Sequence, residues 1–325
     1  MENINNSLRM LAETPWLIEK SALERMARRA MAGPIDAAVP VAARPMARQG
    51  SVAVLPLYGI LRQRGPTFMD MLFEGGGTST DAFAAAFRRM VNDTTVSAIV
   101  IDVDSPGGSV FGTPELADEI LKARGTKPVI AVANSLAASA AYWVASAADE
   151  IVGTPSSMVG SIGVYTMHID FSKMDEMMGI NVTYVAAGKY KVEGNMDEPL
   201  GDEALAALQE QIDEYYDSFV SAVAKGRKTT PSAVRSGYGE GRVVTAKQAL
   251  KLGMIDRIGT LEQTLARYGA SMDGAVRAEE PMEIDVQTSE EPEIEASDDT
   301  PLPESTGESL DIRRRRLEYP ATKRA

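Results

Sequence analysis

The apolar residues of the first 32 positions recur at roughly helical spacing, and this periodicity predicts a helix. Thr14 and Pro15 have the residue types of a helix cap and a first helical turn. The stretch that follows, residues 33–50, contains several prolines and is typical of a linker or an extended arm. We therefore expect residues 1–50 to form an N-terminal helical arm and linker.

From Ser51 onward, short apolar runs alternate with segments of helical spacing. The expected strands are residues 51–58, 96–103, 129–133, 150–152, 182–186 and 254–258. The expected helices are residues 80–91, 114–123, 136–147, 172–178, 202–224 and 245–253. Such alternation predicts an α/β fold with a mainly parallel sheet, which we expect to span residues 51–277.

Residues 278–325 differ from this body in composition. They are rich in Glu, Asp, Pro, Ser and Thr, so they cannot bury enough apolar surface to offset the entropy of ordering. Residues 278–311 hold 13 acidic residues and no lysine or arginine, enough to account for the net charge of −13. We expect a disordered acidic tail ending in the basic cluster 313–316, which is either a solvated extension or a docking or self-processing segment.

The composition excludes several kinds of chemistry. The chain has no cysteine, so disulfides, thiolate metal sites and cysteine nucleophiles are ruled out, and it has one histidine, His168. No run of about 18 apolar residues predicts a membrane span. Closely spaced charges in the first 32 residues leave no apolar core of a secretory signal, so we expect the protein to act in the cytoplasm, where it is made. The mildly acidic body argues against nucleic-acid binding.

Two stretches that follow expected strands hold candidate residues for chemistry. In Ser105-Pro106-Gly107-Gly108-Ser109, the glycines let the backbone approach a ligand closely, and N–H groups at the start of the next helix can face a negative charge. In the second stretch, Ser139 lies among alanines at the start of an expected helix, where Ala140 can lend a backbone N–H. Taken alone, the first stretch is an ordinary turn and the second a face of small residues for packing.

Two further stretches supply a serine and two lysines, Gly160-Ser161-Ile162-Gly163-Val164 and Gly188-Lys189-Tyr190-Lys191. A lysine acts as a base only if burial or a cationic neighbour lowers its pKa, and it also needs an orienting hydroxyl. A single lysine is more often a solvated side chain. His168 is an alternative base, although a histidine without a clear partner is more often structural.

The order and spacing of these stretches carry a resemblance that none of them carries alone. Over about residues 51–259 the chain resembles the signal peptide peptidase A family, serine peptidases of the ClpP/crotonase-like fold. The late stretch 245–256, which contains Thr245-Ala246-Lys247-Gln248-Ala249, matches as well. The resemblance implies an α/β fold of repeated β-β-α units wound as a superhelix.

By this resemblance Ser139 is the nucleophile, Lys191 and not the neighbouring lysine is the general base, and Ser161 orients that base. The backbone N–H groups of Gly108 and Ala140 would form the oxyanion hole. The chemistry agrees, because a serine hydroxyl needs an adjacent base and a neutral lysine replaces histidine in variants of the triad. No cofactor and no metal are implied.

Within the family, the layout of the chain resembles the phage capsid assembly (prohead) proteases. The resemblance implies a ring-like homo-oligomer, with subunit contacts expected in residues 202–224 and 229–241. It would act in the host cytoplasm or the prohead interior on scaffold, capsid or portal proteins, and on its own tail. The alternatives are a soluble housekeeping peptidase, a non-catalytic capsid-interaction protein, and an acyl-CoA enzyme of the same fold that would need neither Ser139 nor Lys191.

Overall fold

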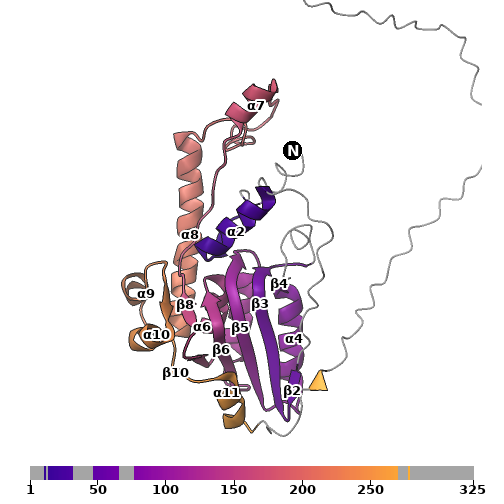
Figure 1. Cartoon of the computed structure of the whole chain (residues 1–325), viewed down its shortest axis with the longest axis vertical. Coiled ribbons are helices and arrows are strands. Elements are labelled where there is room, and N and C mark those ends of the chain that lie inside the picture. Colours follow the sequence, from indigo (N-terminus) through magenta and orange to yellow (C-terminus); the bar gives the residue numbers. More distant parts are fainter. Residues whose placement is uncertain (1–10, 12–13, 32–46, 66–76, 270–276, 279–325) are drawn as a thin grey trace, which may run out of the picture. The chain divides into compact units, whose positions relative to one another are not determined.

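Three long parallel strands form the centre of the sheet. The computed structural model describes residues 11, 14–31, 47–65, 77–269 and 277–278. In it, β3 (Val52–Arg62), β5 (Ala98–Ser109) and β6 (Val129–Ala138) lie side by side and run parallel (Figure 1). The first halves of β5 and β6 are buried at consecutive positions, because both faces of the sheet are covered.

Short strands extend the sheet on both sides. Next to β6 lie β7 (Glu150–Gly153) and β10 (Arg257–Ile258), both parallel to their neighbours. Next to β3 lie β2 (Ala47–Gln49) and β11 (Arg277–Ala278), both antiparallel. The prediction of an α/β fold with a mainly parallel sheet is confirmed, although the last expected strand, 254–258, is shortened to β10.

The long strands are divided into two sections, and the second sections lead to the candidate site. Register shifts within the β3–β5 and β5–β6 pairings mark the division. Beyond it, β4 (Gly77–Ser79) pairs with β3, β8 (Met158–Gly160) pairs with β6, and β9 (Val243–Thr245) runs antiparallel beside β8. Helix α4 follows β3 and β4, α5 follows the two sections of β5, and α6 follows the two sections of β6. This order gives the repeated β-β-α unit that was expected.

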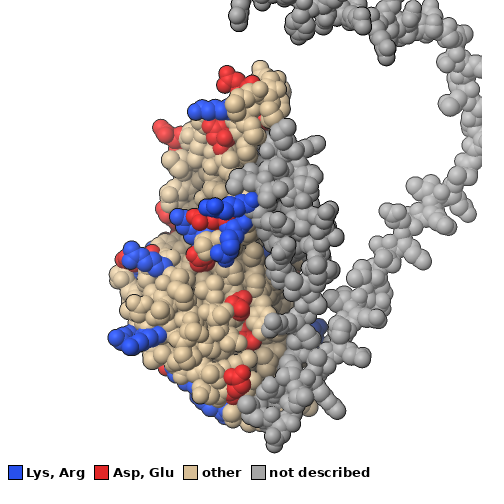
Figure 2. All heavy atoms as spheres, in the orientation of Figure 1, with Lys and Arg blue, Asp and Glu red and all other residues tan. Residues whose placement is uncertain are grey.

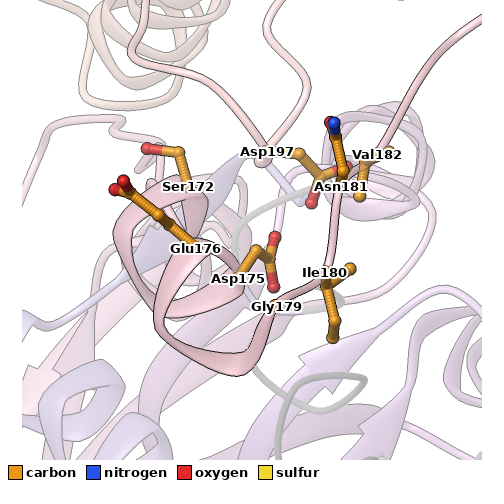
Figure 3. Close-up of a pocket in the computed structure, with 8 residues that line it drawn as sticks. All are labelled: Ser172, Asp175, Glu176, Gly179, Ile180, Asn181, Val182 and Asp197. Atoms are coloured by element: carbon orange, nitrogen blue, oxygen red, sulfur yellow. The ribbon is translucent and has the colours of Figure 1, made fainter.

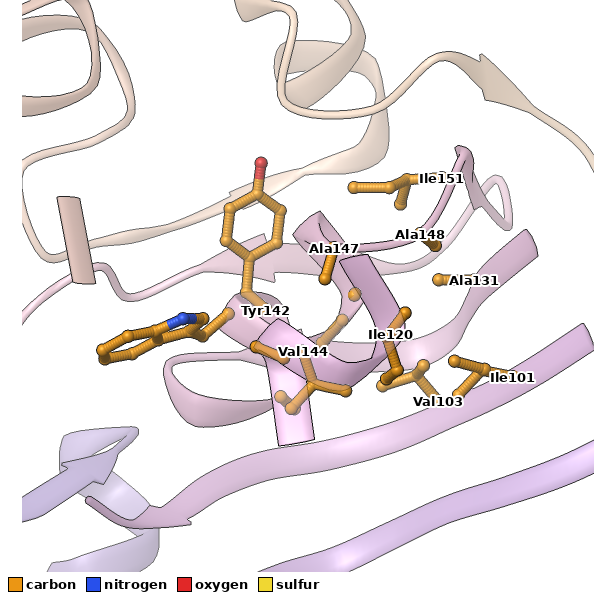
Figure 4. Packing of buried hydrophobic residues seen from close by; sticks show 14 of the residues in the cluster. Ile101, Val103, Ile120, Ala131, Tyr142, Val144, Ala147, Ala148 and Ile151 are labelled. Carbon is orange, nitrogen blue, oxygen red and sulfur yellow. The ribbon is translucent and has the colours of Figure 1, made fainter. Parts of the chain in front are cut away.

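Helices α4 (Thr80–Asn92), α5 (Thr113–Ala123) and α6 (Ala140–Ser146) cover one face of the sheet. Figure 4 shows the core beneath them, with Ile120 of α5 close to the strand residues Ile101 and Val103. The alternate strand residues Val100 and Val132 belong to a separate apolar cluster, to which Leu265 of helix α11 (Leu261–Arg267) contributes. This alternation is what a sheet covered on both faces requires.

Helix α6 is buried along its whole length because it contains only small and apolar residues and inward-facing polar ones. Trp143 of α6 stacks on Phe219 of α8 (Asp202–Gly226), with the ring centroids 4.7 Å apart. At the other end of α6, Arg124 donates hydrogen bonds to the carbonyls of Ser146 and, in α8, Gly226. These contacts fix α6, and with it the residue that precedes it, Ser139.

The C-terminal part of the body begins its helices at threonine caps. Helices α9 (Pro231–Gly237), α10 (Ala246–Leu252) and α11 each follow a threonine whose side chain accepts a backbone N–H of the first turn. The expected helix 245–253 is therefore confirmed, with Thr245 as its cap. None of the helices in the described ranges combines the length and the apolar character needed to cross a membrane.

An arm, defined here as residues 166–201, extends from the body between β8 and α8. It contains α7 (Ser172–Met178), whose bounds the sequence predicted. In Figure 1, α7 and the first part of α8 extend beyond the end of the sheet. The predicted strand 182–186 is wrong, because these residues are exposed and have no strand beside them, and Val185 is 98% exposed.

The predicted N-terminal helix is wrong in its middle. β1 (Trp16–Ile18) is a strand that pairs antiparallel with the end of β5, and helix α2 (Lys20–Met31) begins after it. Its apolar residues fit a helical period in the sequence, but pairing with β5 decides their conformation. Residues 1–10, most of the linker and residues 279–325 of the expected tail lie outside the described residues, so the domain boundaries stay predictions.

Charges of both signs are interspersed on the face shown in Figure 2. The densest group on that face lies over α2, where Lys20 and Glu24 form an ion pair of 3.5 Å one turn apart.

Candidate active site

Ser139 occupies the tight connection between β6 and α6. Its φ of 54° and ψ of −120° are unusual for a residue with a side chain and cost about 1–3 kcal/mol. The surrounding bonds hold it there, since its N–H donates to the Gly160 carbonyl (2.7 Å) and its carbonyl accepts the Trp143 N–H (2.9 Å). The Ser139 hydroxyl is buried and has no hydrogen-bond partner among the described residues. A buried hydroxyl without a partner at a strained position is a candidate nucleophile.

A glycine-containing section of β5 lies directly against the start of α6. A Cβ added to Gly107, whose φ is 101°, would lie 2.9 Å from the Ala138 oxygen and 3.0 Å from the Ala140 nitrogen. A Cβ added to Gly108 would lie 2.0 Å from the Leu61 oxygen. Glycine is required at both positions because the backbones approach so closely. The structure therefore brings the Gly107–Gly108 segment next to Ala140.

This section is not the tight turn that the sequence suggested. The strand β5 continues through Ser109. Ser105 fixes its path, because its hydroxyl donates to the Gly59 carbonyl (2.6 Å) and accepts the Gly107 N–H (3.1 Å). Helix α6 likewise begins at Ala140 and not at residue 136, because residues 136–138 pair with β8.

Ser161 follows directly on β8, beside the candidate nucleophile. Its own φ is 54°, it is almost fully buried, and its N–H donates to the Arg242 carbonyl (2.8 Å). Gly160, the residue before it, accepts the Ser139 N–H, so the two serines belong to adjacent hydrogen-bonded segments. The contribution of Arg242, through a backbone carbonyl, could not have been found from residue types in the sequence.

Lys191 lies on the exposed arm. Its N–H donates to the Gly188 carbonyl (3.2 Å), and its side chain is exposed. The neighbouring Lys189 is engaged separately, in a 2.8 Å ion pair with Glu203. Because the Ser139 hydroxyl has no hydrogen-bond partner, the Lys191 amine is not bonded to it within this single chain.

His168 is not placed as a base for Ser139. Its Nε2 lies 2.9 Å from the backbone carbonyl oxygen of Asn195, in the part of the arm that leads back toward α8. The histidine therefore ties the two sides of the arm together, and no contact joins it to the Ser139 hydroxyl in the described residues.

A cavity of about 410 Å³ lies between α7 and the chain that follows it (Figure 3). Its lining includes the carboxylates of Asp175, Glu176 and Asp197, and none of the sequence-predicted site residues. The predicted site residues other than Lys191 lie where the backbones of the end of β5, the start of α6 and the end of β8 meet.

This chain is similar to known proteins in sequence. The model of "Peptidase family S49" matches residues 122–273, which include Ser139, Ser161 and Lys191. This stretch of the chain is therefore similar to peptidase family S49. The prediction that this chain resembles signal peptide peptidase A-like serine peptidases is confirmed.

Two curated relatives of this chain come from different sources. It is 35% identical over 175 residues to the putative protease MJ0651 of Methanocaldococcus jannaschii, covering 54% of this chain and 56% of that one. It is 31% identical over 238 residues to capsid assembly protease C of Escherichia phage lambda, covering 73% of this chain and 53% of that one. The chain thus spans about half the length of these relatives.

Among solved structures, this chain is similar to the S97A mutant of the 1510-N membrane-bound stomatin-specific protease. The match covers 68% of this chain and 85% of that one, at 16% identity and a TM-score of 0.41.

Proposed function

We propose that the chain is a serine endopeptidase with Ser139 as nucleophile, Lys191 as general base, and Ser161 as the residue that orients the lysine. The observation that carries the proposal is the buried, unpartnered Ser139 hydroxyl at a strained connection. The backbone N–H groups of Gly108 and Ala140 are the proposed oxyanion-hole donors, and the close approach of β5 to the start of α6 supports this assignment.

In the proposed reaction, Ser139 Oγ bonds to the carbonyl carbon of a peptide bond while its proton passes to the neutral Lys191 amine. The oxygen of the tetrahedral intermediate then carries the negative charge, which two N–H donors stabilise. The protonated lysine gives its proton to the leaving amine as the C–N bond breaks, leaving an acyl ester on Ser139. Water, deprotonated by the same lysine, hydrolyses that ester and restores both residues.

The proposal requires Lys191 to reach Ser139 from another subunit or after a movement of the arm. An exposed lysine on an extended arm is suited to the first route, because a neighbouring molecule can bury it. The arm also exposes large apolar side chains, including Met177, Ile180 and Val185. Apolar residues exposed on a projecting element favour a protein interface. We therefore propose a ring-like homo-oligomer in which the arm of one subunit completes the site of the next.

Peptide hydrolysis by four purified proteins tests the dyad. We expect the wild type to cleave an unfolded protein such as casein, and Ser139→Ala and Lys191→Ala to lose at least about a thousandfold in kcat/KM. Lys189→Ala is the matched control, because this lysine is also exposed on the arm and should be dispensable. Full activity in Ser139→Ala would overturn the nucleophile, and full activity in Lys191→Ala the base.

Mixing the two inactive variants tests whether the dyad spans subunits. After denaturation and refolding together, Ser139→Ala supplies intact lysines and Lys191→Ala supplies intact serines. Random assembly of a ring with head-to-tail contacts should restore about a quarter of wild-type activity. No recovery, in a mixture shown to co-assemble, would mean that each subunit provides its own lysine.

As a finer proposal, the substrates are proteins of a phage head during its maturation, with scaffold, capsid or portal proteins as partners. The match to a phage capsid assembly protease over 73% of this chain supports it. The tail is proposed as a further substrate. Intact mass over time should show loss of a C-terminal piece beyond about Arg277 in the wild type and not in Ser139→Ala. If both proteins stay whole, self-processing is excluded; if both are trimmed alike, another protease is responsible.

A further inference from the structure

Strand β1 lies beside the candidate site, between the strand β5 on one side and the backbone near Tyr165 on the other. On one side it pairs antiparallel with the end of β5, with Trp16 opposite Ser109 and Ile18 opposite Gly107. On the other side, Trp16 exchanges two backbone hydrogen bonds with Tyr165, of 2.9 and 3.2 Å. The segment 161–165 on this second side begins at Ser161. The strand thus lies between the two segments that contain the proposed oxyanion and lysine-orienting residues.

The register of β1 directs one of its carbonyls toward the proposed oxyanion hole. The Val110 N–H donates to the Pro15 carbonyl (3.2 Å), and the Glu19 N–H donates to the Pro106 carbonyl (2.7 Å). Hydrogen-bonded pairs alternate with non-bonded pairs along an antiparallel ladder. Leu17 and its partner, the residue opposite it, therefore form the bonded pair that lies between the Pro15 and Glu19 pairs.

That partner is Gly108, and the alternation turns the Gly108 N–H toward the Leu17 carbonyl. The position of Gly107 agrees, because a Cβ there would lie 2.1 Å from the Leu17 oxygen and 3.0 Å from the Ala140 nitrogen. The Leu17 carbonyl therefore lies beside both proposed oxyanion donors, where the carbonyl of a bound peptide would have to lie.

The side chains of β1 alternate between two apolar environments. Leu17 is completely buried and belongs to the main core, together with Ala140 and Ile162 on either side of the candidate site. Trp16 and Ile18 point the other way, into a smaller cluster with α2. An extended chain held by backbone bonds, with one apolar side chain entering the body next to the nucleophile, is how a peptide substrate binds an edge of a sheet.

We propose that β1 occupies the peptide-binding groove of this chain, with Leu17 in the place of the substrate residue that precedes the cut. The proposal rests on the proposed peptidase function. β1 then excludes other peptides until it is displaced, and the groove takes an extended peptide with an apolar side chain of about the size of leucine at that place. Because β1 is tethered, its effective concentration is about millimolar, so a substrate at micromolar concentration competes poorly while β1 stays folded.

A reversible cross-link tests this placement in the full chain, which has no cysteine of its own. Trp16 and Ser109 face each other at a non-hydrogen-bonded position of the ladder. At such a position the two Cα atoms are close enough for a disulfide. In the variant Trp16→Cys/Ser109→Cys, oxidation should fix β1 in the groove and lower kcat/KM for a leucine-containing peptide by at least about tenfold. Reduction of the same sample should restore it, so the comparison is made within one protein.

The matched control is Ser51→Cys/Ser97→Cys, at the opposite end of the sheet. The two serine hydroxyls already lie 2.7 Å apart, so the cysteines should join equally well. Oxidation of this pair should leave kcat/KM within about twofold of its reduced value, since it lies away from the groove. Intact mass confirms the loss of two hydrogens in each case.

The outcomes separate the two proposals. Failure of the first pair to cross-link, while the control pair does, would show that β1 does not lie beside β5. Complete cross-linking without loss of activity would show that β1 does not block the groove and would leave the peptidase proposal intact. Absence of any Ser139-dependent hydrolysis, in the wild type and in both reduced variants, would overturn the peptidase proposal and this inference with it.

Discussion

At the scale of single residues, the candidate site depends on backbone conformations that side chains normally avoid. Ser139 and Ser161 both have a φ of 54°, and Gly107 has a φ of 101°. The first two positions are held by hydrogen bonds to Gly160 and Arg242, so the strain is offset by the surrounding chain. Strain kept at three neighbouring positions indicates that the fold is built to fix these backbone groups.

The substitution Gly107→Ala should abolish peptide hydrolysis and destabilise the fold by about 1–3 kcal/mol. The new Cβ would lie within 3.0 Å of the Ala140 nitrogen and would push β5 away from α6. Urea unfolding and kcat/KM measure the two effects. Gly125→Ala is the control, because its φ is also positive (84°) but nothing lies within 4 Å of its Cβ. It should lose some stability and no activity; equal loss of activity in both variants would contradict the close approach at Gly107.

At the scale of elements, buried side chains tie helix ends to one another around α6. Tyr142 of α6 donates a 2.8 Å hydrogen bond to the Met254 carbonyl, and burial raises the pKa of its hydroxyl. Arg124 joins the C-terminal ends of α6 and α8 through backbone carbonyls. The Arg124 bonds hold α6 at the end that is remote from Ser139, so they position the site without contacting it.

Replacing Arg124 with methionine keeps most of its apolar stem and removes the donors to several helix-end carbonyls. We expect a loss of about 2–4 kcal/mol in the free energy of unfolding, since buried carbonyls would be left without partners. Arg88→Met is the control, because Arg88 forms only an exposed pair with Glu119 and should cost less than about 1 kcal/mol. Similar losses from chemical denaturation of the two variants would contradict the role of Arg124.

The pair of Arg227 with Asp256 should make stability depend on acid pH. Burial alone would raise the pKa of Asp256, but hydrogen bonds from the Arg227 guanidinium (2.6 and 2.9 Å) and the Ile151 N–H (2.7 Å) outweigh it and lower the pKa. A carboxyl group whose pKa is lowered by folding stabilises the fold above its unfolded pKa, and this contribution is lost as the pH falls through the folded value.

The wild type should therefore be more stable than Asp256→Asn near pH 7. The difference should shrink as the pH falls below about 4, the ordinary range of an aspartate. Urea unfolding of both proteins from pH 7 to pH 3 measures it. A difference that stays constant over that range would show that Asp256 acts through its shape and not through its charge.

At the scale of the whole molecule, the arm carries features that the body of a single chain does not use. It holds the proposed base, and it exposes apolar side chains that find no partner in the body. Only the C-terminal half of α8 contributes extensively to the main core, through residues such as Phe219 and Val223. An element that is exposed over half its length is suited to bind a second copy of the chain.

Val185→Glu tests this assignment, because Val185 is 98% exposed and contacts little within the chain. We expect the melting temperature of the isolated subunit to stay the same while light scattering shows a smaller assembly, and peptide hydrolysis should fall with it. Leu250→Glu, on α10, replaces another exposed apolar residue and should leave the assembly unchanged. An unaltered assembly in Val185→Glu would remove this part of the arm from the interface.

Much of the α/β body could be predicted from the sequence, because buried strands and helices have apolar residues at characteristic spacings. The bounds of α7 follow from that pattern, whereas α6 begins four residues later than the pattern predicted, because residues 136–138 pair with β8. The site residues came from the family resemblance, because each stretch taken alone has an ordinary structural reading. Ser139, Ser161 and the glycines of β5 lie on adjacent segments, and Lys191 is not bonded to the Ser139 hydroxyl in the described residues.

Contacts between segments far apart in the sequence could be seen only in the folded chain. The apolar residues of β1 fit a helical spacing, and they form a strand because β5 and Tyr165 supply hydrogen-bond partners on both sides. The apolar residues near Val185 predict a strand, but in the described residues no strand pairs with them. Apolar segments and reactive side chains can be identified from residue types alone. The position of each segment depends on which backbone groups it pairs with. This pairing cannot be predicted from residue types, because nearly every residue carries the same backbone N–H and C=O groups.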